Sequence, residues 1–317
     1  MPGNYPRYPS RDQVVDYLEE YAVSEGVRVR FNTEVANCHR ESGLWETVTT
    51  TGEITESENV VIATGLSQIP NIPRYPKQEL FEGEIVHSAD YRNGRPYVVK
   101  YVLVVGFGNS GAEIALDLME HGAHVFISVR NPGVVVPRDV AGIPALTIAS
   151  WLSVFPPKVE DWLSKPLLRI MVGDLSKVGI SKAHWGPLEQ IAIQQKIPML
   201  DVGTLDALRS GELKARPAID RFTEKGVMFI GGRSEPFDAV IFATGFEPGV
   251  DRILEQTEGI LDDQGRPLIS GGTTTEPSLY FCGFVESPTG RLRAIGIEAE
   301  HIADLIAVDG GSVPLRP

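Results

Sequence analysis

The sequence predicts an α/β fold, and three observations support that prediction. The first is a continuous apolar run at 101–105 that leads directly into a glycine-rich turn. The second is the tripeptide Ala-Thr-Gly, which follows an apolar run twice, at 63–65 and at 243–245. The third is that helical and strand patterns follow one another both at 10–31 and at 101–129. The recurring tripeptide indicates two related modules.

The first predicted helix begins near Ser10. Ser10 and Gln13 have the spacing of a capping box, in which each side chain accepts a hydrogen bond from the other residue's backbone. Apolar side chains recur at helical spacing from 14 to 22, and Gly26 is a typical stop. After this helix, β-rich runs predict strands at 27–31, 44–50 and 60–64, the middle one in a small antiparallel excursion.

The rest of the chain mixes regular and irregular segments. Residues 66–98 are rich in proline, glycine and aromatics and are interpreted as a connector, and 137–200 form an irregular apolar insert. Helices are expected within the insert near 146–154 and 159–172, and later elements are strands at 213–215, 227–230, 239–244 and 279–282 and a helix at 294–308. The insert residues that fit either a substrate pocket or ordinary core packing are Trp151, Phe155, Trp162, His184 and Trp185.

Length and charge set limits on function. A chain of 317 residues suits one large domain or two ordinary ones, and 42% hydrophobic residues allow a sizeable core. The formal charge of −13 argues against a nucleic-acid-binding surface, so no nucleic-acid partner is expected. The six histidines show no metal-like clustering along the sequence, so no metal site is expected.

The cysteines and apolar runs indicate a compartment. Cys38 and Cys282 lie far apart in apolar surroundings, which favours two reduced thiols in a cytoplasmic protein over a disulfide. The first residues lack the apolar core of a signal peptide. The most apolar long stretch, 140–155, contains Pro144 and is too short to span a bilayer, so no membrane span is expected.

The turn after the run 101–105 reads Gly-Phe-Gly-Asn-Ser-Gly, a GxGxxG pattern. Gly106 permits the tight turn, Gly108 lets the backbone approach a pyrophosphate, and Gly111 lets helix and strand pack closely. Asn109 and Ser110 complete the turn, and the free amides of the next helix suit an anion. A lone GxGxxG is weak evidence, but strand, turn, helix, stop and strand fall in register here. We predict a Rossmann-like dinucleotide site in preference to a purely structural turn.

The end of the next strand favours NADP over NAD. An NAD site usually carries Asp or Glu there for the ribose hydroxyls. Residues 125–138 contain no acid and supply Ser128 and Arg130, with Arg138 further along. A guanidinium can pair with a 2′-phosphate in bidentate fashion, whereas the alternative is a solvated surface arginine.

Residues 81–91 read Phe-Glu-Gly-Glu-Ile-Val-His-Ser-Ala-Asp-Tyr, which contains the pattern FxGxxxHxxxY. This pattern matches the identifying motif of the flavin-containing monooxygenases, and it lies between the first Ala-Thr-Gly and the GxGxxG turn. The chain more specifically resembles the YUCCA-like branch of that family and its bacterial relatives. The similarity covers essentially the whole chain, with supporting runs at 8–12, 104–113, 200–205 and 237–246.

The resemblance implies two dinucleotide-binding domains, with the NADP domain inserted in an incomplete FAD domain. Residues 1–94 and 235–317 would form the residual FAD domain, and 95–234 the NADP domain with its insert. It also implies an NADPH- and FAD-dependent monooxygenase. NADPH reduces FAD, reduced flavin adds O₂, and the flavin hydroperoxide transfers one oxygen to a small organic substrate. Because the cofactor carries this chemistry, no catalytic triad or dyad is expected.

The resemblance also marks individual residues. His87 lies near the hinge between the two domains, where an orienting or coupling role is favoured over proton transfer. Thr64 and Thr244 end buried strands, where hydroxyls and nearby amides can meet the dinucleotides. Ordinary strand–turn chemistry explains these two threonines equally well.

Three further positions come from the same comparison with the family. Val35 resembles the position whose backbone meets the FAD adenine, and a core valine is an equally good interpretation. Gly283 and Arg291 belong to a stretch that leads into the last helix and approaches the flavin ring. The alternative for this stretch is a plain loop with a solvated arginine.

Part of the family pattern is not found in this sequence. Family members begin with a strand and a GxGxxG that holds the FAD pyrophosphate, and residues 1–60 contain no such turn. The chain is therefore expected to be N-terminally truncated, with a miscalled start or gene fragment as the favoured explanation. The alternatives are an NADP-binding fragment without flavin or turnover and a separate chain that supplies the missing N-terminal module. A homo-oligomer is also compatible with the sequence.

A rival enzyme class and the identity of the substrate are two chemical questions that the sequence raises. A pyridine-nucleotide disulfide reductase shares the two-module plan but needs a CxxC-like pair, which this chain lacks. The small-molecule substrate stays open between an aromatic keto acid, such as indole-3-pyruvate, and soft nitrogen or sulfur nucleophiles.

Overall fold

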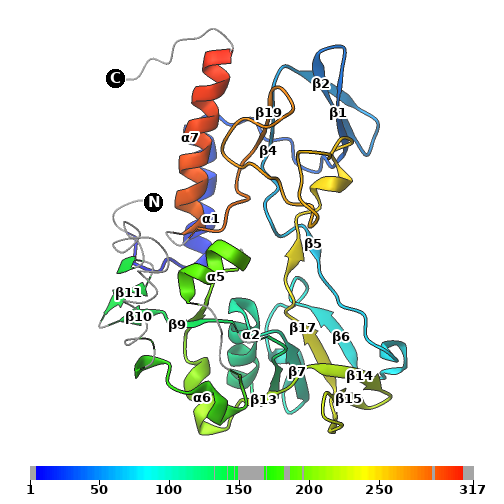
Figure 1. Cartoon of the computed structure of the whole chain (residues 1–317), viewed down its shortest axis with the longest axis vertical. Helices are drawn as coiled ribbons and strands as arrows, with labels where there is room; N and C mark the ends of the chain where they lie inside the picture. Colours follow the sequence, from blue (N-terminus) through cyan, green and yellow to red (C-terminus); the bar gives the residue numbers. More distant parts are fainter. Residues whose placement is uncertain are drawn as a thin grey trace. The chain divides into compact units, whose positions relative to one another are not determined.

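The computed structural model covers the chain in two compact units, Met1–Ser57 and Glu58–Pro317, shown in Figure 1 and described here one at a time. The described residues are 5–131, 133–140, 142–145, 147–148, 168, 170–181, 186–194, 196–287 and 290–309. The aromatic residues predicted for a substrate pocket at 151–185 lie outside them. Among the described residues, no helix combines the length and apolar character needed to cross a membrane.

The described part of the first unit contains helix α1 and an antiparallel sheet. Helix α1 (Arg11–Ser24) begins with the predicted capping box, since the Gln13 amide donates to Ser10 Oγ at 3.2 Å and the Ser10 amide donates to Gln13 Oε1 at 2.9 Å. No residue of α1 is buried. The sheet has the order β1-β2-β3, formed by Val35–Glu41, Leu44–Thr49 and Ile54–Ser57.

The strand predicted at 27–31 is wrong. This segment is irregular and its apolar side chains are exposed, with Phe31 at 80%. A strand needs a neighbour to satisfy its backbone N–H and C=O groups, and no strand described in the first unit pairs with it. The strand predicted at 44–50 is confirmed as β2.

The second unit is built on a five-stranded parallel sheet with the order β13-β8-β7-β17-β6. The chain order differs from this spatial order, because β17 inserts between β6 and β7 and β13 lies at the far edge. The strands are β6 (Glu84–His87), β7 (Tyr101–Val105), β8 (His124–Ser128), β13 (Lys214–Arg216) and β17 (Ala239–Phe242). Two strands of the sheet thus lie outside 95–234, the range predicted for the NADP domain, because β6 precedes that range and β17 follows it.

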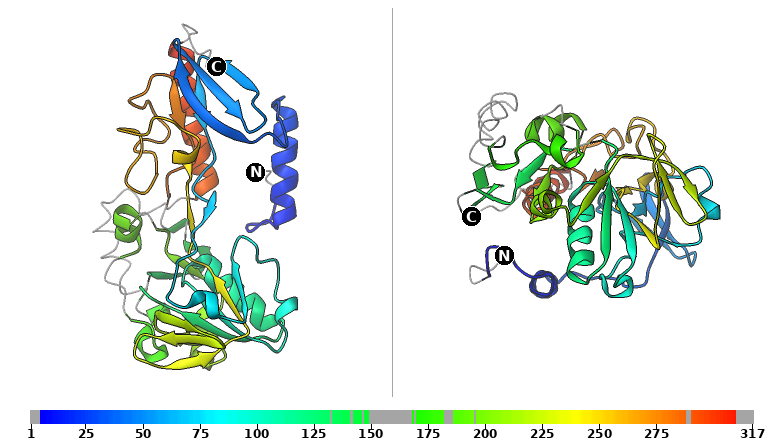
Figure 2. Two further views of the ribbon diagram at one scale, coloured as in Figure 1. Left: turned by 90° about the vertical axis from the view of Figure 1, so that its right-hand side faces the viewer. Right: turned by 90° about the horizontal axis from the view of Figure 1, so that it is seen from below.

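Both faces of this sheet are covered, as the continuous apolar strands require. On one face, Val102, Val104 and Ile241 pack with helices α2 (Asn109–Glu120) and α6 (Thr204–Ser210). On the other face, Leu103 and Val240 pack against an antiparallel sheet of β14 (Ile219–Thr223), β15 (Gly226–Phe229) and β16 (Ser234–Pro236). Figures 1 and 2 show these layers around the sheet.

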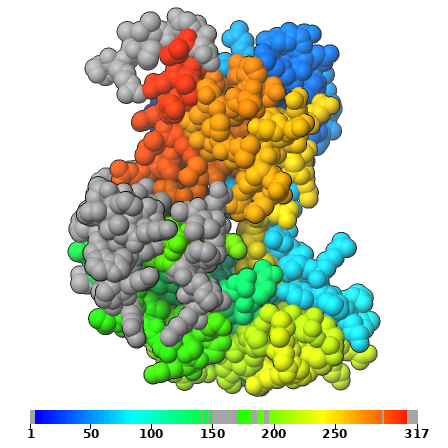
Figure 3. Space-filling view, viewed as in Figure 1, coloured from blue at the N-terminus to red at the C-terminus, as the bar shows by residue number. Residues whose placement is uncertain are grey.

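Shorter elements complete the second unit. Strand β4 (Val60–Ile62) pairs in parallel with β19 (Leu279–Phe281), and α7 (Arg291–Asp309) packs Ile302 into a small core with Tyr280 and Cys282. Figure 3 shows α7 at the surface, consistent with its exposed Leu292 and Ile297. The remaining elements are β5 (Ile69–Pro70), η1 (Gln78–Leu80), η2 (Arg95–Tyr97), β9 (Val135–Pro137), β10 (Asp139–Val140), β11 (Ile143–Pro144), η3 (Leu175–Val178), α5 (Pro187–Gln194), β12 (Met199–Asp201), β18 (Phe246–Glu247) and η4 (Val250–Arg252).

Several sequence predictions are confirmed in this unit. The predicted strands at 213–215, 227–230, 239–244 and 279–282 correspond to β13, β15, β17 and β19, and the helix at 294–308 corresponds to α7. The strand predicted at 60–64 ends earlier, at Ile62. Cys282 of this unit and Cys38 of the first unit are both buried and free of a disulfide, in agreement with the prediction of two separate thiols.

Candidate cofactor-binding site

Most of the predicted site residues gather at one edge of the parallel sheet. Phe242, the last residue of β17, is in register with Val105 on one side and with His87 on the other. Val105 is in turn in register with Ser128, the last residue of β8. The GxGxxG turn, His87, Ser128 and Thr244 therefore lie at the carboxyl ends of adjacent strands. Open α/β sheets bind their ligands at this edge, where the strand order reverses.

The three glycines of the turn have distinct surroundings. Gly106 has φ +120°, and a Cβ added to it would lie 2.3 Å from the carbonyl oxygen of Ala243. A Cβ on Gly111 would lie 2.1 Å from the Gly106 carbonyl oxygen. A Cβ on Gly108 would meet nothing within 4 Å. Packing therefore demands Gly106 and Gly111, while Gly108 leaves open space in front of the backbone.

The start of α2 faces this open space. Gly108 is the N-cap residue and no side chain caps the helix, so the first amides are not occupied by a capping group. Ser110 is exposed in the first turn. Asn109 is engaged elsewhere, because its Oδ1 accepts from the Leu200 amide at 2.7 Å and its Nδ2 donates to the Pro198 carbonyl at 3.5 Å. Asn109 thus fixes β12 beside the helix, and the amides are the groups left to bind an anion.

Ser128 and Arg130, the two residues predicted to bind a 2′-phosphate at the end of β8, have different surroundings. Ser128 is buried and its hydroxyl donates to the Pro217 carbonyl at 2.9 Å, so this group is used within the fold. Arg130 is exposed two residues further on. Its positive charge acts on Tyr75, although burial is the larger influence and raises the pKa of that phenol. The geometry leaves Arg130 as the available charge at this strand end.

Tyr75 was not predicted from the sequence. Its ring stacks on Phe242 with centroids 6.2 Å apart and planes 6° apart, which places it over the last residue of β17. The signal available was the aromatic content of the connector at 66–98, but nothing in a sequence pattern pairs a connector tyrosine with Arg130. Tyr75 is thus an aromatic group at this edge that lies within electrostatic reach of Arg130.

His87 is held as a neutral structural link. Nδ1 accepts from the Ala89 amide at 3.1 Å, so the proton lies on Nε2, which donates to the Gly245 carbonyl at 3.0 Å. The imidazole is 1% exposed and meets Phe246 edge-on, with centroids 4.9 Å apart. Burial lowers the pKa of His87, which opposes a charged form. These contacts tie the end of β6 to the chain after β17, as an orienting role requires.

Thr244 is also engaged within the fold. Its hydroxyl donates to the Asn71 carbonyl, and the Asn71 amide donates to the Gly245 carbonyl at 3.0 Å. These bonds join the second Ala-Thr-Gly to the connector beside the short β5–β18 pair. The Thr244 hydroxyl therefore positions this backbone.

A second strand edge gathers Thr64 and Gly283. The Cys282 amide donates to the Ile62 carbonyl at 3.0 Å, which brings the ends of β4 and β19 together. Thr64 is exposed just beyond β4. Gly283 has φ +87°, and its amide donates to Glu298 Oε2 of α7 at 2.6 Å. The sequence did not single out Glu298, because a helix glutamate gives no pattern that marks its acceptor role.

Arg291 begins α7 and is held by an ion pair. Its Nη2 lies 2.7 Å from Glu286 Oε1, and the Glu286 side chain is 15% exposed. Arg291 is therefore oriented by its own loop. This arrangement differs from the free solvated arginine that was one alternative.

Val35 belongs to the first unit. It begins β1 opposite Thr49 and is half-buried, with a register irregularity between Val35 and Asn37. The Thr50 amide donates to the Glu34 carbonyl at 2.9 Å beside it. The contact of Val35 with an adenine stays a prediction.

A side-chain cluster of the same unit was missed by the sequence analysis. His39, Glu41 and Glu46 bring three potential metal-ligating atoms within 4.8 Å of one another. They are separated along the sequence by ordinary residues, so only the pairing of β1 with β2 reveals them. The expectation that no histidine belongs to a metal-like cluster therefore needs correction.

The parallel sheet with its helix crossover at the GxGxxG turn defines this protein as an α/β protein. Residues 1–256 match the family described as flavin-binding monooxygenase-like. The indole-3-pyruvate monooxygenase YUCCA4 of Oryza sativa subsp. japonica is 35% identical, over 95% of this chain and 72% of its own. YUCCA6 of Arabidopsis thaliana, an indole-3-pyruvate monooxygenase, is 33% identical, over 96% of this chain and 75% of its own. The chain belongs to the flavin-binding monooxygenase family.

Solved structures agree on the fold. A flavin-containing monooxygenase from Stenotrophomonas maltophilia superimposes with a TM-score of 0.69 at 22% identity, covering 98% of this chain and 80% of the other. An oxidized steroid monooxygenase bound to NADP gives 0.72 at 18% identity, covering 96% and 72%. The α/β fold predicted from the sequence is thus confirmed over nearly the whole chain.

Proposed function

We propose that this chain is an NADPH- and FAD-dependent monooxygenase that transfers one oxygen atom of O₂ to a small organic substrate. The observation that carries the proposal is the open GxGxxG turn at the carboxyl edge of the sheet, in a chain that belongs to this family. The proposal assigns the turn to NADPH and the edge formed by β4 and β19 to the flavin.

The residues around the turn fit NADPH. The space in front of Gly108 admits a pyrophosphate, and the amides at the start of α2 would neutralise part of its charge. Arg130 would pair with the 2′-phosphate, and the Tyr75 ring would lie against the adenine. Because β8 ends in Ser128 with no carboxylate, no negative charge from that strand end repels a phosphate.

A smaller set of residues would meet FAD. Thr64 and the backbone at Gly283 would approach the isoalloxazine region, and Arg291 would supply positive charge. The positive φ of Gly283 favours glycine there, whereas a Cβ would make only an ordinary contact with Ile295 at 3.5 Å. FAD, when bound and reduced, would supply the oxygen-activating chemistry, which no side chain can provide.

The roles of the protein's own groups follow from these contacts. The neutral His87 fixes the chain after β17 in register with the turn, and so sets where a nicotinamide would lie. Glu286 holds Arg291 in one orientation, and Glu298 holds Gly283. These are positioning tasks, and catalysis depends on positions of this kind within fractions of an ångström.

The relatives' names suggest a first substrate to test. Two of them are named as indole-3-pyruvate monooxygenases, so we propose an aromatic 2-oxo acid as the substrate class. Soft nitrogen and sulfur nucleophiles are the second class. We also propose the cytoplasm as the compartment, on the basis of the two free thiols.

The decisive experiment uses the purified full chain. Flavin absorbance, NADPH-dependent O₂ uptake, and decarboxylated product from indole-3-pyruvate are measured together, with NADH as the matched cofactor control. We expect a yellow protein that prefers NADPH to NADH. A colourless protein that binds NADPH without O₂ uptake, even after added FAD, would support an NADP-binding fragment and overturn the monooxygenase.

A further inference from the structure

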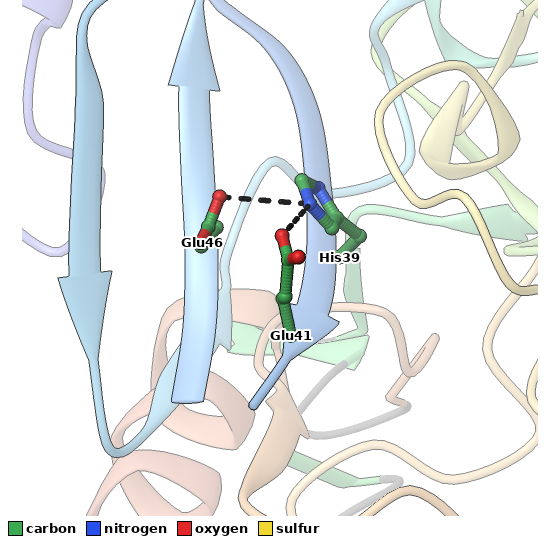
Figure 4. A group of neighbouring side chains, drawn as sticks. All are labelled: His39, Glu41 and Glu46. Atoms are coloured by element: carbon green, nitrogen blue, oxygen red, sulfur yellow. Dashed lines mark ion pairs between the residues drawn. The ribbon is translucent and has the colours of Figure 1, made fainter. Parts of the chain in front are cut away.

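The first unit carries a cluster of three side chains on one face of its sheet. Figure 4 shows His39 and Glu41 projecting from β1 and Glu46 from the neighbouring β2. His39 Nε2 lies 3.6 Å from Glu46 Oε2 and 3.8 Å from Glu41 Oε2. The three potential ligand atoms all lie within 4.8 Å of one another.

The strand geometry explains this convergence. His39 and Glu41 are two residues apart on β1, so their side chains leave the same face of the strand. Glu46 is the residue directly opposite His39 in the antiparallel register. Directly opposed side chains are cross-strand neighbours, so backbone pairing alone sets two of the three groups close together. The register therefore places the three side chains on one face of the sheet, as close neighbours.

The spacing suits a single ion held between the three groups. In a tetrahedral zinc site with bonds of about 2.1 Å, neighbouring ligand atoms lie about 3.4 Å apart. The two histidine–glutamate separations are within a few tenths of an ångström of that value. Glu41 is 65% exposed at its side chain, so it is free to adjust, whereas Glu46 at 19% and His39 at 26% are more firmly held.

The chemistry of the donors selects the kind of ion. One imidazole nitrogen with two carboxylates is a donor set for zinc and similar divalent transition ions, whereas calcium and magnesium prefer oxygen alone. The charge of two carboxylates matches a divalent cation, and the chain's charge of −13 further favours cations. The ordinary alternative is a surface ion pair between His39 and one glutamate, which contributes little to stability.

We propose that His39, Glu41 and Glu46 form a binding site for one divalent transition-metal ion of the zinc type. The ion binds one imidazole nitrogen and two carboxylate oxygens, and water completes its coordination. It cross-links β1 to β2 and so stabilises the sheet of the first unit. This site is independent of the cofactor-binding edge and of the proposed monooxygenase activity.

The experiment titrates metal into the full chain without an affinity tag, because a polyhistidine tag binds the same ions. The protein is freed of metal with a chelator and titrated with ZnCl₂ by calorimetry near neutral pH. A parallel titration with CoCl₂ follows the visible absorption bands that report nitrogen and oxygen ligands. We expect one zinc ion per chain and a higher melting temperature of the zinc-loaded protein.

Three variants test the assignment. We expect His39→Ala to lower zinc affinity by about tenfold or more and to remove the cobalt bands. Glu46→Gln keeps the size of the side chain and should weaken binding more than Glu41→Gln, because the exposed Glu41 must lose more freedom to bind. If His39→Ala does not fold by circular dichroism, Glu46→Gln alone decides the test.

The matched control is His121→Ala. His121 lies 3.5 Å from a single carboxylate, that of Asp117, so it shares the histidine–carboxylate pairing without the third ligand. We expect this variant to bind zinc as the unmodified chain does. Absence of zinc binding, or zinc binding that is unchanged in both His39→Ala and Glu46→Gln, would overturn the proposal.

Discussion

The tripeptide Ala-Thr-Gly follows two parallel strands, β17 and β4, and its residues make different contacts in the two places. After β17, Thr244 donates to Asn71, Gly245 accepts from His87, and the Ala243 carbonyl lies against the GxGxxG turn. After β4, Thr64 is exposed, and the strand pairs among the described residues with β19 alone. The threonine of the tripeptide thus has a hydrogen-bond partner within the fold after β17 and is exposed after β4.

This comparison shows that the tripeptide predicts the position of a strand end but does not predict which contacts its residues make. The edge after β17 sits in a five-stranded sheet with both faces buried, so its polar groups find partners within the fold. The edge after β4 has a single neighbouring strand, and Val61 stays 43% exposed. Substitutions of the tripeptide's own threonine should therefore affect stability mainly after β17 and ligand binding mainly after β4.

The largest effect is expected in the turn that the first edge supports. In Gly111→Ala the new Cβ would lie 2.1 Å from the Gly106 carbonyl, and backbone cannot move away as a flexible side chain can. We expect a loss of about 3 kcal/mol or more in the free energy of unfolding, measured by urea denaturation. The control is Gly108→Ala, whose Cβ meets nothing within 4 Å, so it should fold normally and bind NADPH less tightly. Equal stability of the two variants would contradict the packing argument.

The second effect concerns the charge at the end of β8. Arg130→Ala removes the exposed guanidinium that we assign to the 2′-phosphate. A charge-assisted hydrogen bond is worth about 1.5–3 kcal/mol, so NADPH should bind about 10- to 100-fold more weakly. Binding is measured by fluorescence titration with NADPH and NADH in parallel.

NADH serves as the internal control for Arg130→Ala, because it lacks the 2′-phosphate and should bind equally to both proteins. Arg138→Ala is the matched control among neighbouring arginines. An equal loss of affinity for NADPH and NADH would show that Arg130 supports the site without contacting the 2′-phosphate.

The sequence was sufficient for the elements whose signals are local. The capping box at Ser10 and Gln13, the buried strand before Gly106, and the helix that follows the turn all appear where spacing and composition predict them. Each depends on residues within one turn or one strand. The strand predicted at 27–31 failed because strand formation needs a partner, and composition does not report whether one is present.

The candidate site was predictable in location but not in the use of each side chain. The glycines were interpreted correctly in their packing, but hydrogen bonds across long sequence separations decide the roles of Asn109, Ser128 and Thr244. Their partners are Leu200, Pro217 and Asn71 respectively, and no spacing rule connects these positions. The His39 cluster escaped for the same reason, since it exists only in the register of β1 with β2.

A third effect separates the two threonines directly. Thr244→Val removes a hydroxyl that donates to Asn71, so we expect a loss of about 0.5–1.5 kcal/mol in the free energy of unfolding. Thr64→Val removes an exposed hydroxyl and should leave stability unchanged while lowering flavin retention. Urea denaturation and the flavin-to-protein absorbance ratio are measured for both variants. If Thr64→Val destabilises the protein as much as Thr244→Val does, the proposed difference between the two threonines is contradicted.

The smallest effect is a pH dependence of the free energy of unfolding, which His87 at the first edge should cause. Burial lowers the pKa of His87, so the unfolded chain binds a proton at a higher pH than the folded chain does. The contribution of neutral His87 is present above the ordinary histidine pKa and is lost as the pH falls through the lowered value. The free energy of unfolding should therefore decline from neutral to mildly acidic pH, and the decline should be smaller in His87→Gln. His124→Gln, at an exposed strand start, is the control that should keep the full decline. If His87→Gln declines as steeply as the unmodified chain, then another group takes up the proton, and His87 is not the buried neutral link between β6 and the chain after β17.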